Sequence, residues 1–235
     1  MKKRSGFVSN SSTSSFICEI CGFEAAGHSV GADELGFKVC WNEHVFCEKH
    51  LDLPKPIEYF KFLQKNQDEI AERLEELRES SQKEHHSPWK ERTEKRFKEF
   101  QEMFEVLQEV KGLNESELKE YLKNLDSDIN SRIQSVIDSE YMDSYESYHP
   151  YFCPICSFKL LSLTDLKFYI ISEYKIQELD IFAEIKKQNP RRKKLHTSEF
   201  IELALKKIGK EKSELEMEIQ NRFQNLETLE KWFYK

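Results

Sequence analysis

The sequence has 235 residues and contains no apolar run long enough to cross a membrane, so we expect no membrane partner. It also lacks a Walker A loop, a dinucleotide-binding glycine fingerprint and a G-x-S-x-G element, which argues against the enzyme classes that depend on them. The start Met1-Lys2-Lys3-Arg4 is followed by serine and asparagine instead of an apolar segment, so we expect a cytoplasmic protein that is not secreted.

Two further shortages limit the function. Hydrophobic residues make up only 38% of the chain and charged residues 34%, which favours a small compact head with solvated helices over one large core. The net charge of −7 argues against a protein that coats nucleic acid, because such binding requires Lys and Arg to neutralise phosphates.

What the chain does have is six cysteines at short, regular spacings. In a reducing compartment such spacings indicate a metal site more than disulfides. Thiolates and imidazoles two residues apart suit tetrahedral zinc, and a structural zinc takes four such ligands. The eight candidates therefore predict two structural Zn²⁺ ions; they are Cys18, Cys21, Cys40, His44, Cys47, His50, Cys153 and Cys156.

The order of these ligands resembles a RING-type cross-brace domain, over about residues 17–53 and 152–160. His44-Val45-Phe46-Cys47 and Cys153-Pro154-Ile155-Cys156 are similar to strings of that family. The resemblance implies that the first and third ligand pairs share one ion and that the second and fourth share the other. One ion would then lie among Cys18, Cys21, Cys47 and His50, and the other among Cys40, His44, Cys153 and Cys156.

The resemblance also implies a docking contact for a ubiquitin-conjugating enzyme at Ile20, where the family often has an apolar residue. The chain departs from the family pattern at three places. Residues 51–152 form a far longer connection than usual, His50 stands where cysteine is commoner, and Ser157 stands where active ligases often carry a basic residue.

The residues alone leave other metal partitions open. Cys18, Cys21, His44 and Cys47 would also make a treble-clef-like site, as in the first half of LIM-type modules, although Leu53 stands where the next LIM ligand belongs. With a single zinc ion, Cys40 and His44 would be a buried thiol and a surface imidazole. In a third variant, His149 takes the place of His44.

Apolar residues at three- and four-residue spacings predict helices over most of the remaining chain. One is expected over residues 57–78, one after Pro88, one over 116–136, one ending before Asn189-Pro190 and one from Ser198 with a weak point at Gly209. We therefore predict a mainly α fold with a small zinc-binding head of short β-hairpins. The expected organisation is a flexible Ser-rich arm at 1–16, the head at 17–54 plus 150–163, an inserted helical hairpin or coiled coil at 55–149, and C-terminal helices at 164–235.

The arm, over about residues 4–16, resembles a segment at the N-terminus of many uncharacterised bacterial and phage proteins. The residues indicate no catalytic group, since the cysteine-rich turns offer zinc no open position. We therefore expect a non-enzymatic interaction or assembly protein of phage or bacterial origin, possessing protein partners and forming a homo-oligomer through its helices. The alternatives are a RING-like ubiquitin-type ligase, or a zinc-finger nucleic-acid binder using the basic run Arg191-Arg192-Lys193-Lys194.

Overall fold

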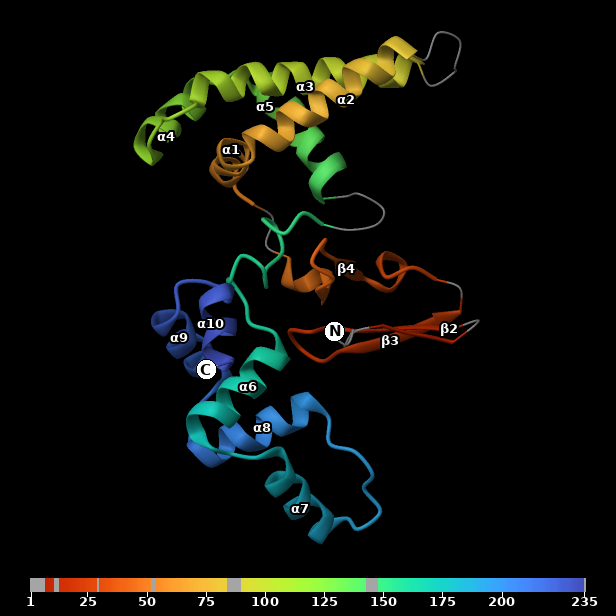
Figure 1. Ribbon diagram of the computed structural model, residues 1–235, viewed down its shortest axis with the longest axis vertical. Coiled ribbons are helices and arrows are strands. Elements are labelled where there is room, and N and C mark those ends of the chain that lie inside the picture. The colour runs from red at the N-terminus through yellow and green to blue at the C-terminus, as the bar shows by residue number, and fades with distance from the viewer. Residues whose placement is uncertain are drawn as a thin grey trace. The chain divides into compact units, whose positions relative to one another are not determined.

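The computed structural model describes residues 7–10, 13–28, 30–51, 54–83, 90–142 and 148–234. The chain divides into two compact units, of which unit 1 comprises Met1–Asp52 and Tyr145–Lys235 and unit 2 comprises Leu53–Ser144. Most described residues are helical and the strands lie near the N-terminus (Figure 1), so the predicted mainly α fold with a small β head is confirmed. No helix among the described residues has both the length and the apolar character that a membrane span requires.

The head of unit 1 contains two small antiparallel sheets. The first has the strand order β1-β2-β3 and the second pairs β4 with β5. Two single-turn 3₁₀ helices accompany them, η1 before β4 and η2 after β5. The bounds are β1 Phe7–Asn10, β2 Thr13–Ile17, β3 Glu24–His28, η1 Asp33–Leu35, β4 Phe37–Val39, β5 Val45–Cys47 and η2 Glu48–His50.

Strands β1 and β2 lie within residues 1–16, the segment expected to be a Ser-rich arm. Composition suggested solvated coil, but β2 pairs along its whole length with β3, with Phe16 opposite Ala25. Phe16 is buried and its ring lies 6.0 Å from that of Phe37. The aromatic residue at the end of the serine run thus gives the strand an apolar contact that composition alone does not reveal.

Unit 2 consists of five α-helices and a short π-helical turn, η3, among its described residues. Helices α2 and α3 pack side by side as a hairpin (Figure 1). The bounds are α1 Pro56–Lys65, α2 Gln67–Lys83, α3 Lys90–Val110, α4 Glu115–Asn124, α5 Ser127–Ile137 and η3 Asp138–Met142.

Two helices predicted as continuous are interrupted in unit 2. The one predicted over 57–78 divides at Asn66, whose side-chain Nδ2 donates to the Phe62 carbonyl over 2.8 Å. The one predicted over 116–136 divides before Asp126, whose carboxylate caps α5 by accepting from the Asp128 amide over 2.7 Å. Asn and Asp side chains compete with the helical backbone for hydrogen bonds, which explains both interruptions.

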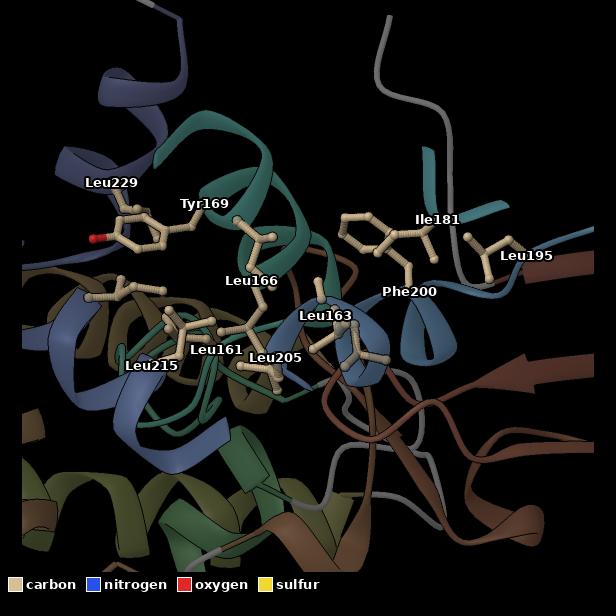
Figure 2. Packing of buried hydrophobic residues seen from close by; sticks show 14 of the residues in the cluster. Leu161, Leu163, Leu166, Tyr169, Ile181, Leu195, Phe200, Leu205, Leu215 and Leu229 are labelled. Carbon is tan, nitrogen blue, oxygen red and sulfur yellow. The ribbon is translucent and has the colours of Figure 1, made fainter. Parts of the chain in front are cut away.

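The C-terminal part of unit 1 is a group of five helices around an apolar core (Figure 2). Tyr169, Leu166 and Phe200 are fully buried in it. Gly209 ends α8 with a left-handed φ of 69°, at the predicted weak point. The bounds are α6 Leu163–Tyr174, α7 Glu178–Gln188, α8 Thr197–Ile208, α9 Lys212–Arg222 and α10 Leu226–Phe233.

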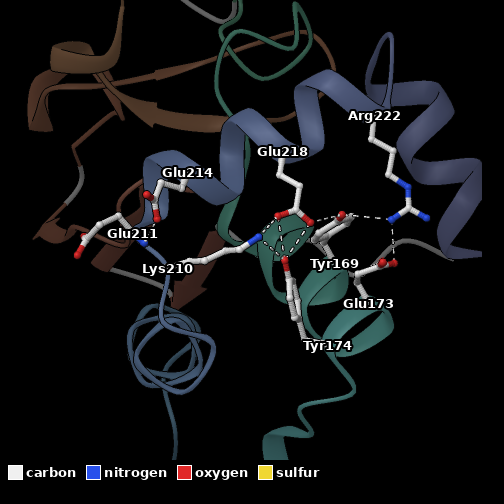
Figure 3. Close-up of polar contacts among 8 residues, drawn as sticks. All are labelled: Tyr169, Glu173, Tyr174, Lys210, Glu211, Glu214, Glu218 and Arg222. Carbon is white, nitrogen blue, oxygen red and sulfur yellow. Dashed lines mark hydrogen bonds and ion pairs between the residues drawn. The ribbon is translucent and has the colours of Figure 1, made fainter.

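A polar network joins α6, α9 and the turn after α8 (Figure 3). The Glu218 carboxylate accepts hydrogen bonds from Tyr169 at 2.8 Å and from Tyr174 at 2.8 and 2.9 Å, and it forms an ion pair with Lys210. Arg222 donates to the Tyr169 hydroxyl over 3.2 Å. The network orients α9 on α6 above the apolar core.

Candidate metal centre

Tight turns bring the ligand pairs together. In the first turn, the Gly22 amide donates to the Cys18 carbonyl over 2.8 Å. Gly22 has a φ of 73°, which favours glycine, and a Cβ there would lie only 3.2 Å from both Leu163 and Ser198, so a side chain would also require these neighbours to shift. The resulting turn, Cys18 to Gly22, is called the first knuckle below.

The second ligand pair lies on a loop between β4 and β5. The Cys40 amide donates to the His44 carbonyl over 3.0 Å, and the Glu43 amide donates to the Cys40 carbonyl over 2.7 Å. Glu43 adopts a left-handed φ of 65°, which is unusual for a residue with a side chain. This strained turn places the Cys40 sulfur 3.4 Å from Nδ1 of His44.

The eight predicted residues form two groups of four. In each group the ligand atoms lie within 4.8 Å of one another, so each group could hold a metal ion. The first cluster is Cys18, Cys21, Cys47 and His50, and the second cluster is Cys40, His44, Cys153 and Cys156. The two sets interleave along the chain as the RING resemblance implied.

The other partitions do not form. His44 lies with Cys40 and not with Cys18 and Cys21, so no treble-clef-like group is assembled, and neither Cys40 nor His44 stands alone. His149 belongs to neither cluster; its Nδ1 accepts from the Tyr151 amide over 3.1 Å, and its ring lies 4.5 Å from that of Trp41.

The distances within the clusters suit a tetrahedral ion. Zn–S bonds of about 2.3 Å separate two sulfurs on a tetrahedron by about 3.8 Å. The Cys21 and Cys47 sulfurs are 3.9 Å apart, and the Cys40 and Cys156 sulfurs are 3.7 Å apart. These separations are far longer than the S–S bond of a disulfide, about 2.05 Å, and all six cysteines are free.

Hydrogen bonds and burial support the same arrangement. The Cys47 amide donates to the Cys18 sulfur over 3.4 Å, and the Asn42 side chain donates to the Cys156 sulfur over 3.4 Å. Such donors stabilise sulfur in its anionic, metal-binding form. In the first cluster, His50 Nε2 is buried and has no hydrogen-bond partner among the described residues, which fits an atom that would bind an ion.

In the second cluster, the pKa values of Cys153 and Cys156 shift in opposite directions. The hydrogen bond from Cys153 lowers the pKa of Cys156 to about 4, while the same contact raises the pKa of Cys153. In the first cluster, burial raises the pKa of Cys47 to about 12. Cys156 is thus the more acidic thiol of this pair, and a cation would have to displace the proton of Cys153.

The first knuckle is covered by the C-terminal helices. Ile20 is only 2% exposed, and its carbonyl accepts a hydrogen bond from Lys212 Nζ over 2.8 Å. The Leu163 amide donates to the Glu19 carbonyl over 2.6 Å. The ubiquitin-conjugating-enzyme contact that the RING resemblance implied at Ile20 is therefore buried within unit 1.

Two acidic residues near the clusters had no signal in the spacing of the sequence. Glu19 accepts a hydrogen bond at Oε1 from the Val45 amide over 3.0 Å, and Asp165 accepts one from the Ser162 hydroxyl over 2.6 Å. Burial raises the pKa of both carboxyl groups. Glu19 has a signal other than spacing, because it is a charged residue between two candidate metal-ligand cysteines.

The basic run from Arg191 to Lys194 lies between α7 and α8. Arg192 forms an ion pair with Glu199, and its Nε donates to the Lys194 carbonyl over 2.9 Å. The positive charge of Arg192 is therefore paired with a carboxylate of unit 1.

Comparisons of the chain with models of known protein families, with curated proteins and with solved structures find no match. Neither the RING resemblance nor that of the N-terminal segment is supported by a family model. The function must therefore be argued from the two clusters and their surroundings.

Proposed function

We propose that unit 1 binds two structural zinc ions and that the protein is a non-enzymatic interaction or assembly protein. The observation that carries the proposal is the interleaving of two four-residue clusters, each of three cysteines and one histidine. An ion in the second cluster would tie Cys40 and His44 to the Cys153–Cys156 turn, although all of unit 2 lies between them in sequence. Zinc would then organise the unit around an insertion.

The donor set supports zinc, and it supports a structural role. Thiolate and imidazole ligands in a tetrahedral arrangement suit Zn²⁺ better than the oxygen-preferring Mg²⁺ or Ca²⁺. A catalytic zinc keeps one position for water, whereas each cluster supplies four protein ligands. Cys18, Cys40 and Cys153 are fully or almost fully buried, which also supports ions held away from solvent.

Exposed aromatic side chains on unit 1 support an interaction role. Phe23 is 52% exposed, Trp41 46% and Phe168 49%. Large aromatic residues are enriched at protein interfaces because they cover much area at low conformational cost. A protein partner or a second copy of this chain is therefore the proposed ligand, and the N-terminal resemblance supports a phage or bacterial origin.

Neither alternative function is favoured by a specific observation. A ligase that docks through Ile20 would need that side chain at the surface, and it is buried. A nucleic-acid binder would need the charge of Arg192, which is paired with Glu199. An interaction or assembly protein requires neither feature.

Elemental analysis of purified protein tests the zinc proposal. We expect two zinc ions in the wild type, one in Cys21→Ser and one in Cys156→Ser, because each substitution removes a ligand from a different cluster. His149→Ala is the matched control and should retain two ions. A wild-type content of one ion, or a single variant that still binds two ions, would contradict the two-site arrangement.

Sedimentation equilibrium of the full chain tests self-assembly. A mass that rises with protein concentration towards a multiple of the monomer supports assembly through a second copy. A monomeric mass over the whole micromolar range rejects the homo-oligomer and leaves a different protein as the proposed partner.

A further inference from the structure

The two clusters are joined by a very short structural element. Strand β5 has three residues, Val45–Cys47, and all of them are buried. His44 of the second cluster precedes the strand, and Cys47 of the first cluster is its last residue. Ligands of different clusters are thus attached to opposite ends of one strand.

The partner strand repeats this arrangement. In the β4–β5 sheet, Phe37 pairs with Cys47 at the end near the first cluster. Val39 pairs with Val45 at the other end, directly before Cys40 of the second cluster. An ion in either cluster would therefore hold one end of the same two-stranded sheet.

Glu19 connects the first knuckle to this sheet. Its amide donates to the Val45 carbonyl over 2.8 Å, and its Oε1 accepts from the Val45 amide over 3.0 Å. Both backbone groups of Val45 are thus bonded to the residue that follows Cys18. When the first knuckle is ordered, these two hydrogen bonds also hold Val45, the residue next to His44, in place.

We propose that the two metal sites fill cooperatively, with strand β5 as the shared element and Glu19 as the residue that couples them. The first ion would order the sheet and bear the conformational entropy cost, so the second ion would meet a site that is already formed. The coupling is reciprocal, because each ion must raise the affinity of the other by the same factor. This inference rests on the proposed zinc-binding function.

The coupling is measured by Zn²⁺ competition with a chromophoric chelator, using full-length protein. The overall two-ion binding constant of the wild type is divided by the product of the single-ion constants of Cys21→Ser and Cys156→Ser. Independent sites give a ratio of one. We expect a ratio between about 5 and 150, the usual range for coupled sites. His50→Ala replaces Cys21→Ser if the latter does not fold.

Variants of Glu19 test its role. Glu19→Ala, introduced into the wild type and both single-site variants, should bring the ratio close to one. Glu19→Gln keeps an oxygen that can accept from the Val45 amide and should retain most of the coupling. Glu48→Ala is the matched control, since Glu48 also follows a ligand cysteine but lies exposed in an ion pair with Lys38.

The outcomes separate this inference from the proposed function. A wild type that binds no zinc overturns both. A wild type that binds two ions with a ratio of one overturns only the coupling. A ratio that is unchanged in Glu19→Ala overturns the role of Glu19.

Discussion

The two units of this protein differ in the interactions that stabilise them. Unit 2 contains no cysteine, and its described helices bury a set of large apolar side chains that includes Phe60, Phe62, Leu63, Phe100 and Met103. In the head of unit 1, the strands β2, β3, β4 and β5 have only three to five residues each. The head buries aromatic side chains such as Phe37 and Phe46, and its two clusters could hold ions that cross-link it further.

The C-terminal helices sharpen this contrast, since they belong to unit 1 and yet resemble unit 2 in their packing. Their core of leucine, isoleucine and aromatic residues needs no metal ligand (Figure 2). The two clusters that could hold a metal ion lie outside this core. Each region should respond differently to metal removal and to core substitutions.

Metal removal should give the largest effect. With excess chelator we expect the β4 and β5 amides to lose hydrogen-exchange protection, while the amides of α3 in unit 2 retain it. Structural zinc contributes about 10–16 kcal/mol in small zinc-binding domains, which exceeds the stability of most domains. Hydrogen exchange with mass spectrometry of the full chain measures both regions in one sample. Equal loss of protection in α3 would remove the contrast between the units.

Phe62→Ala should have the next largest effect, confined to unit 2. Phe62 is fully buried and its ring lies 4.9 Å from that of Tyr141. Removing a buried phenyl ring costs about 3–5 kcal/mol. Chemical denaturation should show this loss, with zinc content unchanged by elemental analysis. Leu179→Ala, at a position 78% exposed, is the control and should be near neutral.

Glu43→Gly should give a smaller effect that depends on metal. The left-handed conformation costs a residue with a side chain about 1–2 kcal/mol, and the greater entropy of glycine in the unfolded chain offsets part of the relief. We expect a gain of up to about 1 kcal/mol with zinc, because the strained turn belongs to the second cluster.

Lys175→Gly provides the matched comparison for Glu43→Gly. Lys175 has a φ of 57° at the end of α6, away from the clusters. Its gain should be the same with zinc and with chelator, whereas that of Glu43→Gly should disappear when metal is removed. Thermal unfolding under both conditions measures the difference. A Glu43→Gly gain that persists in chelator would show that the turn forms without metal.

The metal-ligand candidates were predictable because the signal is local. Cysteines two residues apart must be close in space, so spacing alone suggested the ligand pairs. Which pairs would meet was implied only by the RING resemblance, since the residues alone left other partitions open. The cover over Ile20 was not predictable, since it depends on Lys212 and Leu163, which lie far away in sequence. Contacts at such separations follow from the packing of whole helices and leave no periodic pattern.

The prediction of helices from the sequence was also incomplete, although less so. Periodicity predicted where helices occur, but the interruptions at Asn66 and Asp126 depend on side chains that bond to the backbone. The strands β1 and β2 were missed because a serine-rich composition is also typical of solvated coil. The Phe16–Phe37 contact that distinguishes the two cases is made only in the folded head.

The smallest expected effect concerns the polar network of the C-terminal helices, and it depends on pH (Figure 3). Burial alone would raise the pKa of Glu218, but hydrogen bonds from Lys210, Tyr169 and Tyr174 outweigh it and hold the pKa below its ordinary value of 4.5. A carboxyl group whose pKa is lowered by folding stabilises the protein above its unfolded pKa. That contribution is lost as the pH falls through the folded pKa.

Glu218→Gln should therefore be less stable than the wild type above pH 4.5, and the difference should shrink as the pH falls below it. The Glu218 side chain is partly exposed, so we expect less than about 1 kcal/mol, reduced further by salt. Urea unfolding at a series of pH values measures the difference. Glu202→Gln is the control, because Glu202 bonds Lys206 on its own helix and should change stability less. If the two variants had the same pH dependence, the network would contribute no more than an ordinary surface ion pair, and the C-terminal helices would depend on their apolar core alone.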